Sequence, residues 1–164
     1  MRHAEAGERD PARWPDDAAR PLTEEGEQKF RRGCRGLRRI VPDVEVVLSS
    51  GATRAWRTAE ILHEEAGWPS PERSSELGSA SSTREIWNAV RKRQVSSVAL
   101  VGHEPHMSEL VSYLLSGNHD VARPEFKKGG VACLRLPDEK VAGTAALHWL
   151  LTPKILQALQ GGTA

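Results

Sequence analysis

Two short apolar runs, each followed at once by a helical pattern, constrain this sequence more than any other feature. The runs are VEVVLSS at residues 44–50 and SVALVGH at residues 97–103, and both have the length and composition of buried strands. After each run the apolar residues recur at helical spacing, beginning near Thr53 and near Pro105. Strands that alternate with helices in this way predict an α/β fold with a largely parallel sheet.

The remaining segments extend the same pattern. We expect helices at residues 23–40, 82–93 and from about 153, and two antiparallel strands at residues 131–136 and 144–150. A capping box at Ser82 and Glu85 begins the second of these helices. The sequence therefore predicts a three-layer α/β/α sandwich around a mostly parallel, mixed sheet. Residues 7–22 lie outside this pattern and predict a long loop of the kind that carries function.

Length and charge narrow the class of protein. The 164 residues predict a single domain, residues 1–164, and the 23 Lys and Arg residues almost balance the 22 Asp and Glu residues. This balance argues against a nucleic-acid or membrane partner, and the arginine-rich stretch at residues 31–39 is interpreted as the solvated face of a helix. The two cysteines are too few for a disulfide framework, and no apolar stretch is long enough to span a membrane. We expect a cytoplasmic protein.

Four residues suited to binding an anion lie at strand ends or near the start of the chain. Arg54 follows the first apolar run, His103 ends the second, and Arg2 and His3 stand at the beginning. Ligands of α/β sheets bind outside the carboxyl ends of the strands, so these side chains can share one pocket. Arginine matches phosphate oxygens through charge-assisted bonds worth roughly 1.5–3 kcal/mol each. The set predicts a phosphoryl group as ligand, with no metal and no cofactor.

A chemical role follows for each of these groups. A neutral imidazole can attack phosphorus and hold the phosphoryl group covalently, which makes His3 the candidate nucleophile. Arg2, Arg54 and a protonated His103 would then stabilise the charge on the phosphoryl oxygens. This scheme needs no Mg²⁺.

An ordered series of motifs along the whole chain resembles the histidine phosphatase superfamily, and within it the small SixA-type phosphohistidine phosphatases. The series begins with Arg2-His3-Ala4-Glu5-Ala6, where the family has Arg-His-Gly or Arg-His-Ala followed by an acid. The later motifs are Arg20-Pro21-Leu22-Thr23 with Gly26, Ser49-Ser50, Arg54-Ala55, Thr58-Ala59-Glu60, Ser75-Glu76-Leu77, Val101-Gly102-His103-Glu104-Pro105 and Thr152-Pro153-Lys154. The resemblance implies a phosphoglycerate mutase-like fold and a phosphatase activity.

The resemblance also implies roles for individual residues. It makes His3 the phosphorylated nucleophile, held beside the second histidine, His103. Arg2 and Arg54 would grip the phosphate, and Arg20, in the loop before the first helix, would be an additional phosphate contact.

Three functions remain open at this stage. The resemblance favours a phosphohistidine on a histidine phosphotransfer domain as the substrate, because little length is left for a lid that would exclude a protein. A phosphatase for small phosphoesters is the alternative, and it would need a general acid, for which Glu76 stands where larger relatives place one. A phosphate-dependent binding module without catalysis is the third, while a phosphoglycerate mutase is disfavoured because no mutase-type acidic segment is found.

The start of the chain departs from the family pattern. The resemblance implies an apolar strand of about five residues before the Arg-His pair. In this sequence only Met1 precedes the pair. We therefore expect the first strand to be missing from the centre of the sheet, with ladder groups on its neighbours unpaired. Either the chain is shortened upstream, or another segment or subunit fills the gap, and the positioning of His3 depends on which.

Overall fold

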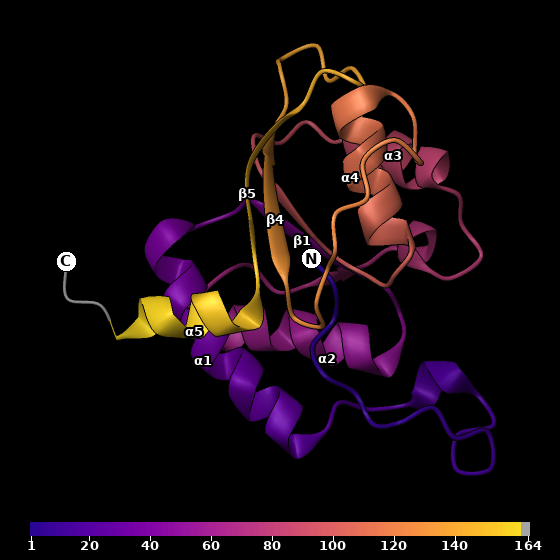
Figure 1. Cartoon of the computed structure of the whole chain (residues 1–164), viewed down its shortest axis with the longest axis vertical. Helices are drawn as coiled ribbons and strands as arrows, with labels where there is room; N and C mark the ends of the chain where they lie inside the picture. Colours follow the sequence, from indigo (N-terminus) through magenta and orange to yellow (C-terminus); the bar gives the residue numbers. More distant parts are fainter. Residues whose placement is uncertain (162–164) are drawn as a thin grey trace.

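The computed structural model describes residues 1–161 and shows helices on both faces of a central layer of strands (Figure 1). Strand β1 (Val46–Ser49) lies between β2 (Glu72–Arg73) and β3 (Val98–Val101), and all three are parallel. Strands β4 (Val131–Arg135) and β5 (Ala146–Leu151) form a separate antiparallel pair. The α/β class predicted from the alternating pattern is confirmed.

Helices α1, α3 and α5 begin directly after capping hydroxyl residues, whereas α2 and α4 have no side-chain cap. Their bounds are α1 Glu24–Ile40, α2 Thr53–Ile61, α3 Thr83–Arg91, α4 His106–Ser116 and α5 Pro153–Gln160. Short helical turns are η1 (Asp17–Ala19), η2 (Leu62–Ala66) and η3 (Ser75–Leu77). The Thr23 hydroxyl accepts from the Gly26 amide at the start of α1, and the capping box of Ser82 and Glu85 is complete at the start of α3.

Neighbouring residues of β1 point into two different cores. Val47 packs with α1, α2 and α5 on one face of the sheet, whereas Leu48 packs with α3 and α4 on the other. On the first face α5 crosses α1 closely, because a Cβ added at Gly36 would lie 1.9 Å from the Leu156 carbonyl oxygen. Only glycine permits this approach, so the α1–α5 contact is specified by one residue.

Residues 1–3 form the only link by hydrogen bonds between the ends of β3 and β4 in the described part of the chain. The Met1 nitrogen donates to the Leu100 carbonyl at 2.7 Å, and the Gly102 amide donates back to the Met1 carbonyl at 3.1 Å. On the other side the Arg2 amide donates to the Gly130 carbonyl at 3.2 Å. These bonds hold the two sheets together at the ends of the strands nearest to the Arg-His pair.

Below this link the two sheets separate. Within residues 1–161 no strand lies between β3 and β4, and a mainly apolar cavity of about 630 Å³ occupies the interval, with Val98, Leu100 and Cys133 among its walls. The single mixed sheet expected from the sequence is therefore divided into a parallel and an antiparallel part. The physical reason is that only residues 1–3 occupy the central position.

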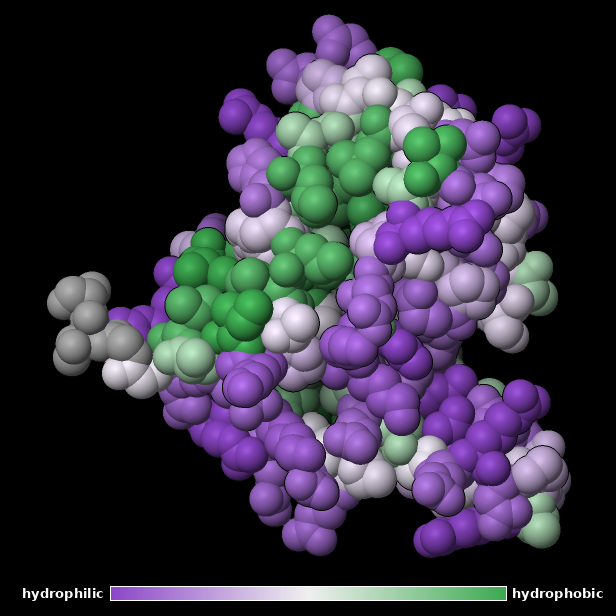
Figure 2. Space-filling model, viewed as in Figure 1, coloured by the Kyte–Doolittle hydropathy of each residue, from purple (hydrophilic) through white to green (hydrophobic). Residues whose placement is uncertain are grey.

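The surface seen in Figure 2 carries an apolar region over β4, β5 and α5. Leu147 on β5 and Ile155 on α5 are 42% and 46% exposed. Among residues 1–161 the structure contains no helix with the length and apolar character needed to cross a bilayer.

Candidate active site

The backbone around His3 is fixed from both sides. The Gly129 amide donates to the His3 carbonyl at 2.8 Å, and the buried Thr58 hydroxyl accepts from the Ala4 amide at 3.0 Å. The imidazole is 6% exposed, and its Nδ1 lies 2.7 Å from the Ala4 carbonyl oxygen. A carbonyl oxygen only accepts, so Nδ1 carries the hydrogen and the lone pair lies on Nε2. His3 is therefore held as the tautomer whose free nitrogen can act as a nucleophile.

His103 lies beside His3, just beyond the end of β3. The two ring centroids are 5.1 Å apart, with the planes inclined at 57°. His103 Nε2 hydrogen-bonds with the Ser50 hydroxyl at 3.0 Å, whereas Nδ1 is buried without a partner. One nitrogen of the ring thus fixes its orientation, and the other is free to contact a ligand.

Two guanidinium groups approach the histidines from different elements. Arg54, in the first turn of α2, donates through Nη1 to the Asp17 carbonyl at 2.6 Å, and its Nη2 lies 3.0 Å from Asp17 Oδ2. Arg2 donates through Nη1 to the Phe126 carbonyl at 2.8 Å. In both arginines Nε is buried and has no partner.

The four residues predicted from separate parts of the sequence therefore lie together. The charges of Arg54 and Arg2, and the neighbouring titratable ring of His103, each help to lower the pKa of His3, as expected for groups close together. Of the five buried side-chain atoms without a partner in residues 1–161, three are the nitrogens on Arg2, Arg54 and His103. Buried polar groups without partners are rare and costly, so a ligand that accepts hydrogen bonds fits this site. A phosphoryl group has such acceptors on three oxygens.

Burial keeps both histidines neutral at pH 7. It lowers the pKa of His3 to about 3 and, together with the charge of Arg54, the pKa of His103 to about 4. The sequence led us to expect a protonated His103, but in this structure the ring is neutral, because burial and the charge of Arg54 both disfavour a second positive charge there. A phosphoryl dianion beside His103 would raise its pKa again.

Arg20 is connected to Arg54 by the carboxylate of Asp17, a residue that the sequence analysis did not select. Its Nε donates to Asp17 Oδ1 at 2.9 Å, and its Nη1 donates to the Gly7 carbonyl at 2.7 Å. Asp17 also contacts Arg54, so one carboxylate joins the two arginines. The spacing of Asp17 and Arg20, three residues apart in the loop, was the available signal for this contact.

Glu76 is placed differently. It lies in η3, where its Oε2 accepts from the Ser74 hydroxyl at 2.7 Å and the Ser75 hydroxyl at 3.3 Å. The Ser74 hydrogen bond in particular lowers the pKa of Glu76, so the carboxylate is ionised at pH 7 and has no proton to donate. None of its hydrogen bonds reaches the cluster around His3, and this environment does not favour a general acid.

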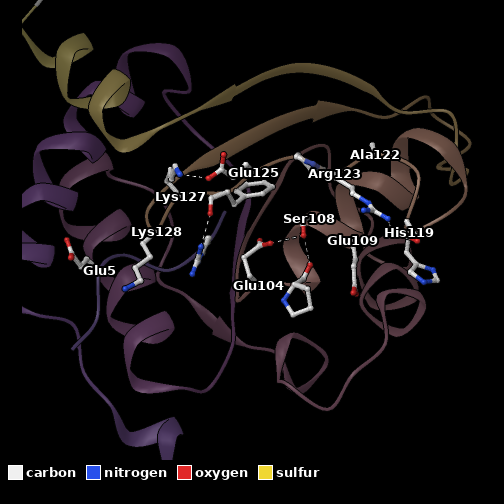
Figure 3. Close-up of a pocket in the computed structure, with 15 residues that line it drawn as sticks. Glu5, Glu104, Ser108, Glu109, His119, Ala122, Arg123, Glu125, Lys127 and Lys128 are labelled. Carbon is white, nitrogen blue, oxygen red and sulfur yellow. Dashed lines mark hydrogen bonds and ion pairs between the residues drawn. The ribbon is translucent and has the colours of Figure 1, made fainter. Parts of the chain in front are cut away.

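A pocket of about 780 Å³ opens beside the cluster on the Arg2 side, and Arg2 is part of its wall (Figure 3). Glu104, just before α4, and Glu109, in its first turn, line the pocket on one side, and Lys127 and Lys128 line it from the segment before β4. Figure 3 shows the Glu104 carboxylate bonded to Ser108, with the Lys127–Glu125 ion pair across the pocket. In residues 1–161 no group of three or more His, Cys, Asp or Glu side chains is arranged to hold a metal ion.

Comparison with known proteins agrees with this geometry. The sequence profile of the histidine phosphatase superfamily (branch 1) matches residues 1–78. The structure of the protein histidine phosphatase SixA in complex with tungstate superposes with a TM-score of 0.81, at 28% identity, over 95% of this chain and 96% of that one. The chain belongs to the histidine phosphatase superfamily. It is a phosphatase with the phosphoglycerate mutase-like fold.

Other similar proteins span nearly the same length. An uncharacterized protein of Picosynechococcus sp. is 31% identical in an alignment of 145 residues that covers 82% of each chain. A Nakamurella multipartitia protein assigned as the phosphohistidine phosphatase SixA matches at 26% identity and a TM-score of 0.73, over 93% of both chains. An Escherichia coli structure assigned as an alpha-ribazole-5'-P phosphatase, at 14% identity and a TM-score of 0.71 over 93% of this chain and 94% of that one, shares the fold alone.

Proposed function

We propose that this protein is a phosphohistidine phosphatase that transfers the phosphoryl group of a phosphorylated protein to His3 and then to water. The observation that carries the proposal is the set of three buried, unpartnered nitrogens on Arg2, Arg54 and His103 around the neutral ring of His3. The similarity to SixA structures supports the choice of substrate.

The first step is an exchange of one phosphorus–nitrogen bond for another. The lone pair on His3 Nε2 attacks phosphorus, and the bond to the substrate nitrogen breaks. Its electron pair stays on that nitrogen, and the substrate ring leaves as a neutral imidazole because its other nitrogen carries a proton. His3 Nδ1 keeps its hydrogen and donates it to the Ala4 carbonyl oxygen throughout, so the ring does not turn. Arg2, Arg54 and His103 donate to the three phosphoryl oxygens, which carry the charge in the transition state.

The second step is hydrolysis of the bond to His3. A water molecule attacks phosphorus, the bond to Nε2 breaks, and inorganic phosphate leaves with the oxygen and protons of that water. The pKa of about 3 helps here, since a weakly basic nitrogen is a better leaving group. The same pKa keeps the nucleophile unprotonated at pH 7, so burial assists both steps.

The nature of the leaving group decides between substrates. Phosphohistidine releases an imidazole, which leaves readily, whereas an alkyl phosphoester needs a proton donor for its alkoxide. Glu76, the residue considered for that task, is ionised and directed to Ser74 and Ser75. The described environment of this residue therefore favours the phosphohistidine substrate over a small phosphoester.

Trapping of the phosphoenzyme tests the proposal. After brief exposure to a phosphohistidine protein and a work-up that avoids acid, mass spectrometry should locate one phosphate on His3. The variant His3→Ala should lose both the label and turnover, while His63→Ala, at an exposed histidine that does not line the pocket of Figure 3, keeps both. Turnover that survives in His3→Ala would refute the covalent mechanism. Phosphate binding without label or turnover in the wild type would instead identify a binding module.

A further inference from the structure

The loop at residues 7–22 supplies a carboxylate to the candidate phosphate site. Its helical turn η1 packs against α2, and Figure 1 shows the loop in indigo on the α2 side of the molecule. Asp16 caps this turn by accepting from the Ala18 amide at 2.9 Å, and Asp17 is its first residue. The cap leaves the Asp17 side chain free to point away from the turn, toward the two arginines.

Asp17 accepts two hydrogen bonds or ion-pair contacts from Arg54 and two from Arg20. Its carbonyl oxygen and Oδ2 take Arg54 Nη1 and Nη2, at 2.6 Å and 3.0 Å. Its Oδ1 takes Arg20 Nε at 2.9 Å, and Oδ2 lies 3.4 Å from Arg20 Nη2. Both arginine side chains are almost buried, at 11% and 12% exposed, whereas the Asp17 side chain is 36% exposed. The carboxylate thus covers the outer side of the pair.

These contacts leave a defined part of Arg54 free. The bonds to Asp17 use its two terminal nitrogens, and the buried Nε has no partner. An arginine side chain has many rotamers, and a guanidinium fixed in advance loses less freedom when it binds an anion. A phosphoryl group then meets a donor that is already oriented.

We infer that Asp17 is a positioning residue, which fixes Arg54 and Arg20 in the orientation that binds the phosphoryl group. The inference rests on the proposed function, because it needs Arg54 and Arg20 to bind phosphate. It goes beyond that function by assigning a negative residue to an anion site. A negative charge beside a phosphate would by itself weaken binding, so positioning and repulsion predict opposite effects when Asp17 is changed.

Equilibrium binding of inorganic phosphate, measured by titration calorimetry, separates the two effects. Asp17→Ala removes the charge and the two side-chain acceptors but keeps the backbone carbonyl that accepts from Arg54 Nη1, and we expect about tenfold weaker binding, close to the effect of losing one charge-assisted contact. Asp17→Asn removes the charge but keeps one acceptor, and should weaken binding less. Asp16→Asn is the matched control, since it removes the same charge from the neighbouring residue while Asn still caps the turn. It should change the affinity by less than twofold.

A double-mutant cycle shows whether Asp17 acts through its arginine partner. When Arg54 has already been replaced by alanine, Asp17→Ala should weaken phosphate binding clearly less than it does in the wild type. The reason is that Arg54, one of the two groups that Asp17 positions, is then absent. Turnover of an aryl phosphate should follow the same order, with kcat/KM lowest in Asp17→Ala and partly restored in Asp17→Asn. A purely structural role would not give this order.

Several results would overturn the inference. Tighter phosphate binding in either Asp17 variant would make the residue a competitor of the anion. An equal change in Asp16→Asn would assign the effect to net charge, and an undiminished effect in the Arg54→Ala background would exclude the arginine as the route. A wild-type protein that does not bind phosphate would refute the proposed function together with the inference. Normal binding with no response to Asp17 refutes the inference alone.

Discussion

Lowering the pH from 7 to 5 should destabilise the folded protein through the two histidines of the site. In the unfolded chain a histidine has a pKa near 6.5, whereas burial lowers the pKa of His3 to about 3 and that of His103 to about 4. Between pH 7 and pH 5 the unfolded chain therefore binds protons that the folded protein excludes. The stability present above pH 6.5 is lost as the pH falls toward these lowered pKa values.

The magnitude follows from the same pKa values. For each buried histidine the free energy of unfolding should fall by about 2 kcal/mol between pH 7 and pH 5, and the pair accounts for about 4 kcal/mol. Carboxylates contribute mainly below this window, because most remain ionised at pH 5 in both states. The buried α-amino group of Met1, whose pKa burial lowers to about 5, adds a further loss of about 2 kcal/mol, so the two histidines supply about two thirds of the pH dependence.

Urea unfolding followed by tryptophan fluorescence measures the effect. The variants His3→Asn and His103→Asn should each remove about a third of the pH dependence, with the Met1 amine supplying the remainder, whatever they do to stability at pH 7. The variant His119→Asn, at an exposed position, should leave the dependence as it is. If neither single variant changes the slope of stability against pH, the two rings are not held neutral in a buried pocket, and the derivation of a neutral nucleophile fails.

Three further predictions concern single contacts. Glu76→Gln should leave turnover of a phosphohistidine protein within twofold, and a tenfold loss in steady-state kinetics would restore this residue as a general acid. Thr58→Val leaves the buried amide after the candidate nucleophile without an acceptor and should lower the free energy of unfolding by about 1–3 kcal/mol in urea titrations; no change would show that the amide finds another acceptor. Gly36→Ala should lower Tm by several degrees through the clash with the Leu156 carbonyl, while Gly33→Ala in the same helix, where the added Cβ has ordinary contacts at 3.6 Å, should not; equal shifts would contradict the close crossing.

The sequence predicts the elements of this fold well because each has a local signal. The capping residues Thr23 and Ser82 mark helix starts, and the apolar runs mark β1 and β3. Strand β2 was not predicted, since two exposed residues, Glu72 and Arg73, carry no apolar pattern and are held by backbone pairing with β1. Division of the sheet in two was also not predicted, because strand pairing depends on which segment takes the central position.

For the site, the sequence predicts which side chains lie close together, and the structure adds their protonation states. Residue type and strand-end position were enough to select His3, His103, Arg2 and Arg54. The neutral form of His103 was not predictable, because it depends on burial that no local pattern encodes. Asp17 was missed for a related reason, since an acidic residue in a loop is ordinarily solvated.

Residues 1–3 include the candidate nucleophile and also connect the two sheets by hydrogen bonds. His3 is bonded through its amide to Gly102 and through its carbonyl to Gly129, so the same three-residue segment that bears the reacting ring also ties the parallel sheet to the antiparallel pair. A fluctuation that widens the cavity between β3 and β4 must displace this segment and change the distance between the rings of His3 and His103. We accordingly expect heat or pressure to lower the activity before the helices unfold, because the candidate nucleophile lies in the segment that joins the two sheets.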